Sequence, residues 1–155
     1  MTKQPSSHAL AAKAIRAELK AMGIKGAKVR SDSFAGGNAV RVSLIDIAPE
    51  KVEVARKRLN MYQYGHFDGM TDSYEYSNGI EELPQVKYVQ VSSNYSDVVK
   101  ELAYQEIRRT YAGFEDAPET YVDRARDFRD KHGNYASQLV HRFLCEQKTY
   151  ETIVD

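Results

Sequence analysis

The sequence predicts an α+β protein with a small, mainly antiparallel three-stranded sheet and helices, in the order α-β-β-α-loop-β-α-α-α. Apolar residues recur at helical spacing near the start and throughout the C-terminal half. Between them lie short runs that alternate apolar with polar residues, which is typical of half-buried strands. The 155 residues are 42% hydrophobic and 28% charged, the ordinary composition of a globular protein, so we expect a single domain over 1–155.

The first half of the chain contains one helix, one hairpin and a second helix. The helix is expected over 7–22, because Ser6 is a good N-cap, apolar residues follow at intervals of three or four, and Gly23 ends the pattern. Alternation over 27–34 and 39–47, with Gly-Gly-Asn between the two runs, predicts a β-hairpin. The second helix is expected over 49–61, with a proline in its first turn.

The second half contains one strand and three helices. Alternation over 86–92 predicts a third strand in a central position of the sheet. A helix over 95–112 begins at a serine or asparagine cap. A pattern resembling a capping box predicts another over 116–133, and an amphipathic pattern predicts the last over 134–148.

The net charge is zero, but the charges are unevenly distributed. Residues 1–60 hold 12 Lys and Arg against 5 Asp and Glu, whereas residues 61–155 hold 10 against 17. Either the two halves neutralise each other, or the first half offers a basic surface to an anionic partner such as nucleic acid. The basic residues of that surface would be Lys13, Arg16 and Lys20 along the first helix and Lys28, Arg30 and Arg41 on one face of the hairpin.

Cysteine content and hydropathy bear on the compartment. The one cysteine, Cys145, cannot form an internal disulfide and suits a reducing compartment. No apolar run approaches the roughly 20 residues that span a bilayer, and the N-terminus lacks a secretory signal pattern. We therefore expect a cytoplasmic protein with no membrane partner, and we expect no cofactor.

The most unusual stretch is 62–76, which reads YQYGHFDGMTDSYEY. It contains five aromatic residues and three acids but no Lys or Arg, and its Asp-Gly dipeptide predicts a turn. Ordinary solvated loops are not this aromatic, so we expect the stretch to fold against the body of the protein and to contact a partner. The predicted contact residues are Tyr62, Tyr64, Phe67, Asp68, Asp72, Tyr74, Glu75 and Tyr76.

The sequence contains no recognisable catalytic motif. It has neither a Gly-x-Ser-x-Gly elbow nor a Gly-rich phosphate loop ending in Lys-Ser or Lys-Thr. Oxygen-rich clusters suit Mg²⁺ or Mn²⁺, so His66, Asp68, Asp72 and Glu75 leave a metal-dependent hydrolase or nuclease open. The basic residues and the tyrosines leave direct nucleic-acid binding open, although the tyrosines lie in the acidic half, where phosphates are repelled. We favour a binding protein over an enzyme.

Several segments resemble a known family. They are Ile15-Arg16 with Glu18-Leu19-Lys20, Lys28–Ser31, Gly37–Val42, Phe67–Tyr76, Lys87–Val89 and Tyr95-Ser96. Over residues 10–97 the chain is similar to the twenty-ninth of the large polyvalent protein-associated domains, which occur in proteins of phages and conjugative elements. Residues 23–26 replace a segment that is usually rich in Phe and Pro, and residues 44–46 replace a Trp-Asp-Gly end. Residues 98–155 would form a helical C-terminal extension.

The resemblance implies a phage or mobile-element accessory protein that counters a host defence of the restriction or CRISPR type. It transfers no catalytic residue. The leading hypothesis is therefore protein–protein contact with a host defence complex. Direct nucleic-acid binding is the alternative, and a metal-dependent hydrolase or nuclease is the second alternative. The oligomeric state stays open, with a homodimer as one option.

Overall fold

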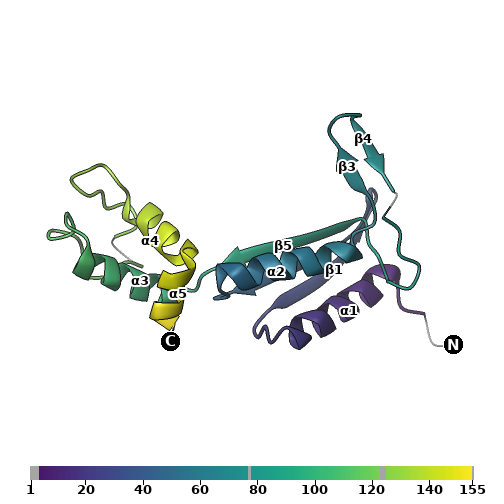
Figure 1. The fold of residues 1–155 in the computed structure, drawn as a ribbon, viewed down its shortest axis with the longest axis horizontal. Helices are drawn as coiled ribbons and strands as arrows, with labels where there is room; N and C mark the ends of the chain where they lie inside the picture. Colours follow the sequence, from purple (N-terminus) through teal and green to yellow (C-terminus); the bar gives the residue numbers. More distant parts are fainter. Residues whose placement is uncertain (1–3, 77, 123–124, 155) are drawn as a thin grey trace. The chain divides into compact units, whose positions relative to one another are not determined.

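The computed structural model describes residues 4–76, 78–122 and 125–154 and has the predicted α+β class. In these residues it contains five α-helices, a three-stranded sheet and a separate two-stranded hairpin (Figure 1). No helix among them is both long enough and apolar enough to cross a membrane.

The contacts divide the chain into two compact units, where the sequence predicts one domain. The sheet unit holds the residues up to Ile45 together with Lys51–Asn94, and the helical unit holds Asp46–Glu50 together with the residues from Tyr95 on. The sheet unit carries 13 Lys and Arg against 8 Asp and Glu, and the helical unit carries 9 against 14. The charge asymmetry of the sequence therefore follows the division into units.

Helix α1 covers Ser7–Ala21, as predicted, and its C-terminus is fixed by a glycine motif. Gly23 adopts φ +72°, a conformation that costs glycine no strain. The N–H groups of Gly23 and Ile24 donate to the carbonyls of Lys20 and Leu19, each at 3.0 Å, which is the Schellman pattern. The buried side of the helix consists of Ala11, Ala12, Ile15 and Leu19.

The three-stranded sheet is mixed rather than mainly antiparallel. β1 (Lys28–Phe34) and β2 (Gly37–Ile45) form the predicted antiparallel hairpin. β5 (Tyr88–Asn94) pairs parallel with β2, so the order is β1-β2-β5, and the third predicted strand lies at an edge rather than in the centre. Parallel neighbours need a long crossover, which α2 (Pro49–Leu59) and the segment after it supply.

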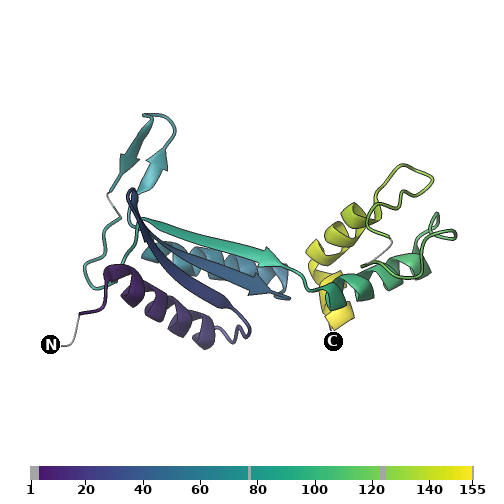
Figure 2. The same cartoon turned by 180° about the vertical axis from the view of Figure 1, so that it is seen from behind.

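One face of this sheet is covered by helices and the other is open. Val40, Val42 and Leu44 of β2 are buried, and they alternate with the exposed Arg41 and the half-buried Ser43. α1 and α2 contribute their own buried apolar residues to the sheet unit. Figure 2 shows the strands in front of α2, with no described helix crossing in front of them. The face of Arg41 is therefore accessible.

Tyr62 ends the 3-10 helix η1 (Asn60–Tyr62) and belongs to the core. Its side chain is 3% exposed, and its Oη donates to Glu18 Oε1 at 3.0 Å. Arg58 Nε donates to the other oxygen of the same carboxylate at 3.0 Å. Tyr62 thus ties the end of α2 to α1, and its prediction as a partner-contact residue is wrong because the ring is sealed away from solvent.

The helical unit contains α3, α4 and α5. α3 (Asp97–Thr110) begins where predicted, with the Ser96 side chain accepting the Val99 N–H at 3.4 Å. The last predicted helix is divided into α4 (Ala136–Cys145) and α5 (Gln147–Val154).

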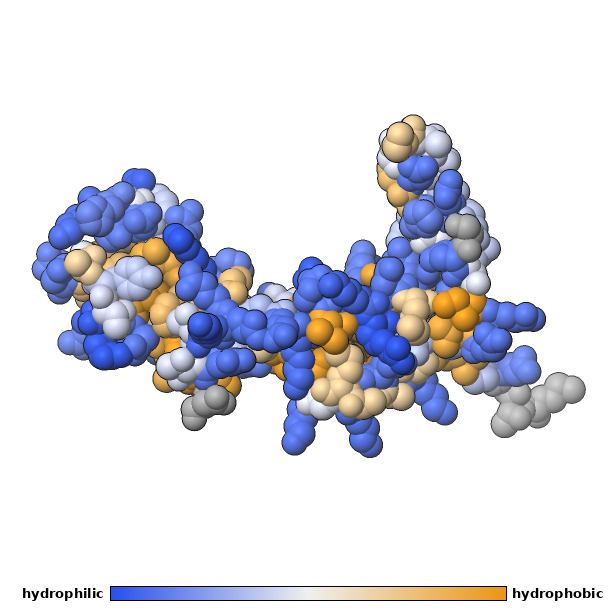
Figure 3. All heavy atoms as spheres, in the orientation of Figure 1, coloured by the Kyte–Doolittle hydropathy of each residue, from blue (hydrophilic) through white to orange (hydrophobic). Residues whose placement is uncertain are grey.

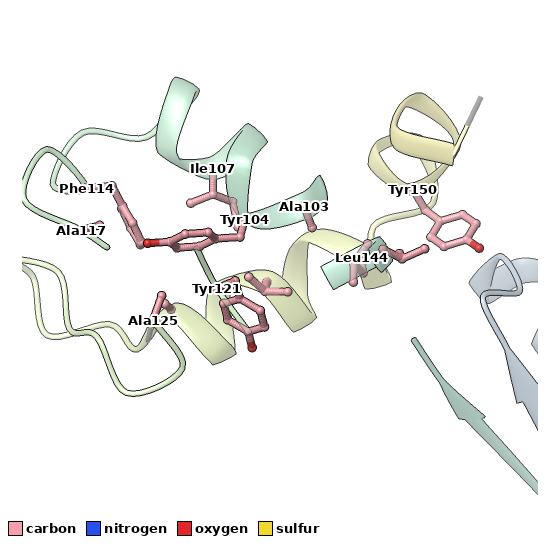
Figure 4. Close-up of a cluster of buried hydrophobic side chains, with 12 residues drawn as sticks. Ala103, Tyr104, Ile107, Phe114, Ala117, Tyr121, Ala125, Leu144 and Tyr150 are labelled. Atoms are coloured by element: carbon pink, nitrogen blue, oxygen red, sulfur yellow. The ribbon is translucent and has the colours of Figure 1, made fainter. Parts of the chain in front are cut away.

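The helix predicted over 116–133 is absent from the described part of that segment; residues 123–124 lie outside the described residues. Residues of this segment instead join the buried cluster of the helical unit, and Figure 4 shows Ala117, Tyr121 and Ala125 in that cluster with Tyr104 of α3. The Tyr104 ring centroid lies 6.3 Å from that of Phe114 and 5.4 Å from that of Tyr121.

Side chains of α3 take up the backbone groups that a helix would have used. Tyr104 Oη donates to the carbonyl of Pro118, and Glu101 accepts the N–H of Tyr121 at 2.8 Å. Proline itself has no N–H to offer a helical ladder. The capping-box pattern therefore predicted a helix where irregular backbone packs against α3.

The Glu18 carboxylate predicts an acid-sensitive contribution to stability. The hydrogen bond from Arg58 lowers its pKa, with burial acting in the opposite direction. The stabilisation should therefore be complete above the unfolded-state pKa and should be lost as the pH falls through the folded-state pKa. Glu18→Gln should lower the free energy of unfolding by about 1–3 kcal/mol near neutral pH.

Urea denaturation at about pH 7 and about pH 3 measures this difference. The variant and the natural protein should converge at the lower pH. The matched control is Glu53→Gln, on the exposed side of α2, which should change little at either pH. An equal deficit of Glu18→Gln at both pH values would contradict the assignment.

Candidate functional site

The stretch after Tyr62 forms a short β-hairpin instead of a loop. β3 (His66–Asp68) and β4 (Ser73–Glu75) pair antiparallel. Asp68 Oδ1 accepts the Met70 N–H at 2.9 Å, as expected for the turn that Asp-Gly predicts. In Figure 1 the hairpin lies at the end of the sheet where β5 begins. The stretch therefore folds against the body only near its base, and its tip is exposed.

The hairpin register separates the rings from the acids. Phe67 lies opposite Tyr74 with ring centroids 6.0 Å apart, so these two rings share one face. His66 lies opposite Glu75, and their nearest side-chain atoms are 3.8 Å apart on the other face. Asp68, next to Phe67 in β3, alternates onto the face of His66. The acidic neighbours of the tyrosines thus point away from the rings.

The exposed rings form a continuous series that also includes two residues of the sheet. We call it the aromatic row; in spatial order it consists of Phe34, Tyr88, Tyr74, Tyr76 and Tyr64, with Phe67 beside Tyr74. Successive ring centroids are 6.1, 6.5, 6.0 and 5.1 Å apart. Five of the six residues are 37–56% exposed, and Tyr88 is half-buried. An ordered aromatic surface of this kind is typical of a binding site.

Lys87 places a positive charge within the row. Its Nζ lies 5.4 Å from the ring centroids of both Tyr74 and Tyr88 and donates to the carbonyl of Gly36 at 2.9 Å. The neighbouring Tyr88 hydroxyl raises the pKa of Tyr74, and the Tyr74 hydroxyl lowers the pKa of Tyr88. The lysine and the contact between the Tyr74 and Tyr88 rings join the hairpin to the start of β5.

Three side-chain amides, which we call the amide clamp, fix the base of the hairpin. Asn78 Oδ1 accepts the Gly65 N–H and its Nδ2 donates to the Gln63 carbonyl, both at 2.8 Å. Gln63 Oε1 accepts the Val89 N–H at 3.0 Å, which ties the base to β5. Gln85 Nε2 donates to the carbonyls on either side of the base, those of Met61 and Asn78.

Gly65 is required where the chain enters the hairpin. Its φ is +85°, and a Cβ there would lie 2.8 Å from the ring of Tyr76. A side chain would displace this ring and would also strain the backbone. The glycine therefore brings the Tyr76 ring close to the backbone at the base of the hairpin.

The open sheet face carries three of the predicted basic residues. Arg30 lies directly opposite Arg41, and Lys28 lies opposite Ser43. Arg41 pairs with Asp32 at 3.1 Å and donates to Gln90 Oε1 at 3.3 Å. These side chains surround a shallow hollow of about 420 Å³. Its lining consists of Lys28, Arg30, Arg41, Val42, Ser43, Gln90, Val91 and Ser92.

The basic hollow and the aromatic row share one face of the sheet. Phe34 has the same strand parity as Lys28 and Arg30, and Tyr88 has the same parity as Gln90. The Phe34 and Tyr88 rings stack across β2 with an interplanar angle of 21°. The row therefore begins where the basic hollow ends.

The basic residues of α1 do not join this surface. Arg16 donates to the carbonyl of Val29 at 2.9 Å and, with Lys20, lines a separate small hollow. Lys13 lines a groove of about 580 Å³ with residues 81–84. The structure thus separates the six predicted basic residues into the set on the sheet and the set on α1.

The metal candidates do not converge. Among the described residues, no group of three or more His, Cys, Asp or Glu side chains is placed to hold a metal ion. Asp68 is engaged in its own turn, where the Met70 N–H lowers its pKa. Asp72 is exposed in the turn, at φ +52°. This arrangement gives the metal-dependent hydrolase no support.

Sequence reasoning missed Phe34, Tyr88, Lys87 and the amide clamp. The parity of Phe34 and Tyr88 with the basic residues was visible in the sequence, but the pairing of β2 with β5 was not.

Comparisons with protein-family models, with curated proteins and with solved structures found no match.

The amide clamp predicts a local effect of removing Asn78. Asn78→Ala deletes two hydrogen bonds at the hairpin base, so amide hydrogen exchange in β3 and β4 should accelerate about tenfold or more. Exchange in β2 should stay unchanged because the sheet core is not touched. Asn60→Ala is the control, since the Asn60 side chain makes no hydrogen bond to the described residues. Unchanged exchange in the hairpin of Asn78→Ala would show that the clamp does not hold it.

Proposed function

We propose that this chain is a non-enzymatic nucleic-acid-binding accessory protein of a phage or another mobile element. The observation that carries the proposal is the open sheet face, on which Lys28, Arg30 and Arg41 surround a hollow that also contains neutral hydrogen-bonding groups. Basic side chains attract phosphates, and amide and hydroxyl groups can bond to bases or sugars.

The charge arrangement supports an anionic ligand. Like charges directly opposite each other in a sheet cost stability, yet Arg30 lies opposite Arg41. Asp32 offsets Arg41 only, and no ion pair to a described residue engages Lys28 or Arg30. A bound phosphate backbone would offset the remaining repulsion. The excess of basic residues in the sheet unit also favours an anionic ligand.

The mobile-element context rests on the resemblance over residues 10–97. In that context the accessory role is to counter a host defence of the restriction or CRISPR type. These systems act on nucleic acid, so a nucleic-acid-binding surface is compatible with the role.

The hairpin tip favours a second candidate function, direct contact with a host defence protein. Met70 is 97% exposed and Phe67 is 56% exposed, and Figure 3 has hydrophobic side chains at the tip. Exposed apolar side chains of this kind favour protein partners. This candidate predicts that binding to a host protein complex depends on Met70 and Phe67 and not on Lys28 and Arg30.

Charge reversal on the sheet face tests the proposal. The double variant Lys28→Glu with Arg30→Glu should bind a labelled mixed-sequence oligonucleotide at least tenfold more weakly at about 50 mM salt. The slope of log affinity against log salt concentration should become shallower by the amount that about two phosphate contacts contribute. Fluorescence anisotropy titrations at several salt concentrations measure both effects.

The matched control makes the same charge change on α1, through Lys13→Glu with Lys20→Glu. This control should retain most of the affinity because those residues lie away from the hollow. An equal loss of affinity in both variants would show that the loss comes from the change in net charge and not from the position of the residues. No binding by the natural protein at low salt would overturn the proposal.

A further inference from the structure

We propose that the ligand is a single strand whose bases stack on the aromatic row while its phosphates pass over the basic hollow. This inference rests on the proposed function and names the class of nucleic acid. It depends on four observations: the accessibility of the rings, their spacing, the position of the acids and the continuity of the row with the hollow.

The rings are accessible and already ordered. Tyr74 and Tyr76 lie nearly parallel, at an interplanar angle of 29°, and are 37% and 48% exposed. The amide clamp and Gly65 fix the base of the hairpin, so little ordering is left to occur on binding. Base–aromatic stacking is tolerant of sequence because every base has a π-face.

The ring spacing favours a single strand over a duplex. Successive centroids in the row are 5.1–6.5 Å apart. In a duplex, neighbouring bases of one strand are about 3.4 Å apart along the axis and are stacked on each other. Bases that land on successive rings must therefore separate from their neighbours and from a complementary strand. A duplex would use the basic hollow but would leave the row without a function.

The two strand acids of the hairpin, Asp68 and Glu75, do not oppose this path, and Asp72 is exposed in the turn. His66, Asp68 and Glu75 lie on the hairpin face opposite Phe67 and Tyr74. The charge within the row is that of Lys87, 5.4 Å from two of its rings. The sequence suggested that acidic residues would repel phosphates from the tyrosines. Strand alternation reduces this repulsion, because it turns the strand acids and the rings in opposite directions.

The row and the hollow can be occupied by one strand. Phe34 and Tyr88 stand on the same sheet face as Arg30 and Gln90. A strand that leaves the hollow therefore meets Phe34 and Tyr88 before it reaches the hairpin rings. We infer a binding site that includes both the sheet and the hairpin, within the roughly 4–16 nucleotides that single-strand-binding folds occupy.

The test measures the binding of three probes to the 155-residue chain. The probes are a labelled DNA strand of about 15 nucleotides, the same strand annealed to its complement, and the matching RNA. The single strands should bind at least tenfold more tightly than the duplex. Stacking should also quench tyrosine fluorescence, which is readable because the chain has 11 Tyr and no Trp. RNA and DNA results distinguish the two sources of single strand, and tight binding of either supports the inference.

Ring variants show whether the row carries the binding. Tyr74→Ala with Tyr76→Ala should weaken single-strand binding about tenfold or more, and Tyr74→Phe with Tyr76→Phe should restore most of it because the rings remain. Tyr111→Ala, at an exposed tyrosine of the helical unit, is the matched control and should bind normally. Circular dichroism and thermal unfolding confirm that each variant is folded.

The outcomes separate this inference from the proposed function. If the duplex binds as tightly as the strand, and the sheet charge reversal abolishes binding while the ring variants do not, the single-strand inference is overturned and nucleic-acid binding stands. If none of the three probes binds at low salt, both are overturned. Binding of a host protein that depends on the same rings, without binding of any probe, would overturn both in favour of the protein partner.

Discussion

The position of the aromatic row depends on how the backbone N–H and C=O groups at the base of the β3–β4 hairpin find hydrogen-bond partners. The chain leaves η1 and forms the hairpin, and residues 78–87, which belong to no named strand, lead to β5. One isolated bridge joins Gln63 to Val86. Gln63, Asn78 and Gln85 supply the donors and acceptors that this irregular backbone needs. Buried polar backbone groups are costly to leave unpaired, so these amides define one orientation of the hairpin. The rings of the aromatic row are ordered as a result.

The same part of the chain explains the mixed sheet and the location of the site. A crossover is needed to place β5 parallel to β2, and α2 occupies only part of it. The remaining residues form the hairpin, which lies where β5 begins and where β1 ends. Tyr74 of the hairpin therefore meets Tyr88 of β5, and Tyr88 meets Phe34 of β1. A sheet with hairpin connections alone would not bring these three rings together.

Local signals in the sequence were sufficient for the elements with strong periodicity. α1, the β1–β2 hairpin and α3 were predictable because their apolar spacing and their Ser and Gly boundary residues agree. Tyr62 could not be distinguished from its exposed neighbours, because its burial depends on Glu18, 44 residues earlier in the chain. The helix over 116–133 was predicted wrongly because the backbone of this segment bonds to α3. Such a contact leaves no pattern in the local sequence. The basic residues of the sheet and the rings of the hairpin were therefore predictable from the sequence, whereas the contacts between rings of different strands were not.

The aromatic row formed by residues 34, 88, 74, 76 and 64 should act as one binding surface. The most direct measurement is NMR of the aromatic ring signals while an unlabelled single-stranded oligonucleotide is added. The signals of Phe34, Tyr74, Tyr76 and Tyr88 should shift together with one affinity, while those of the buried Tyr104 and Tyr121 should stay in place. Shifts confined to other residues, or none at a concentration where binding is otherwise saturated, would contradict this prediction.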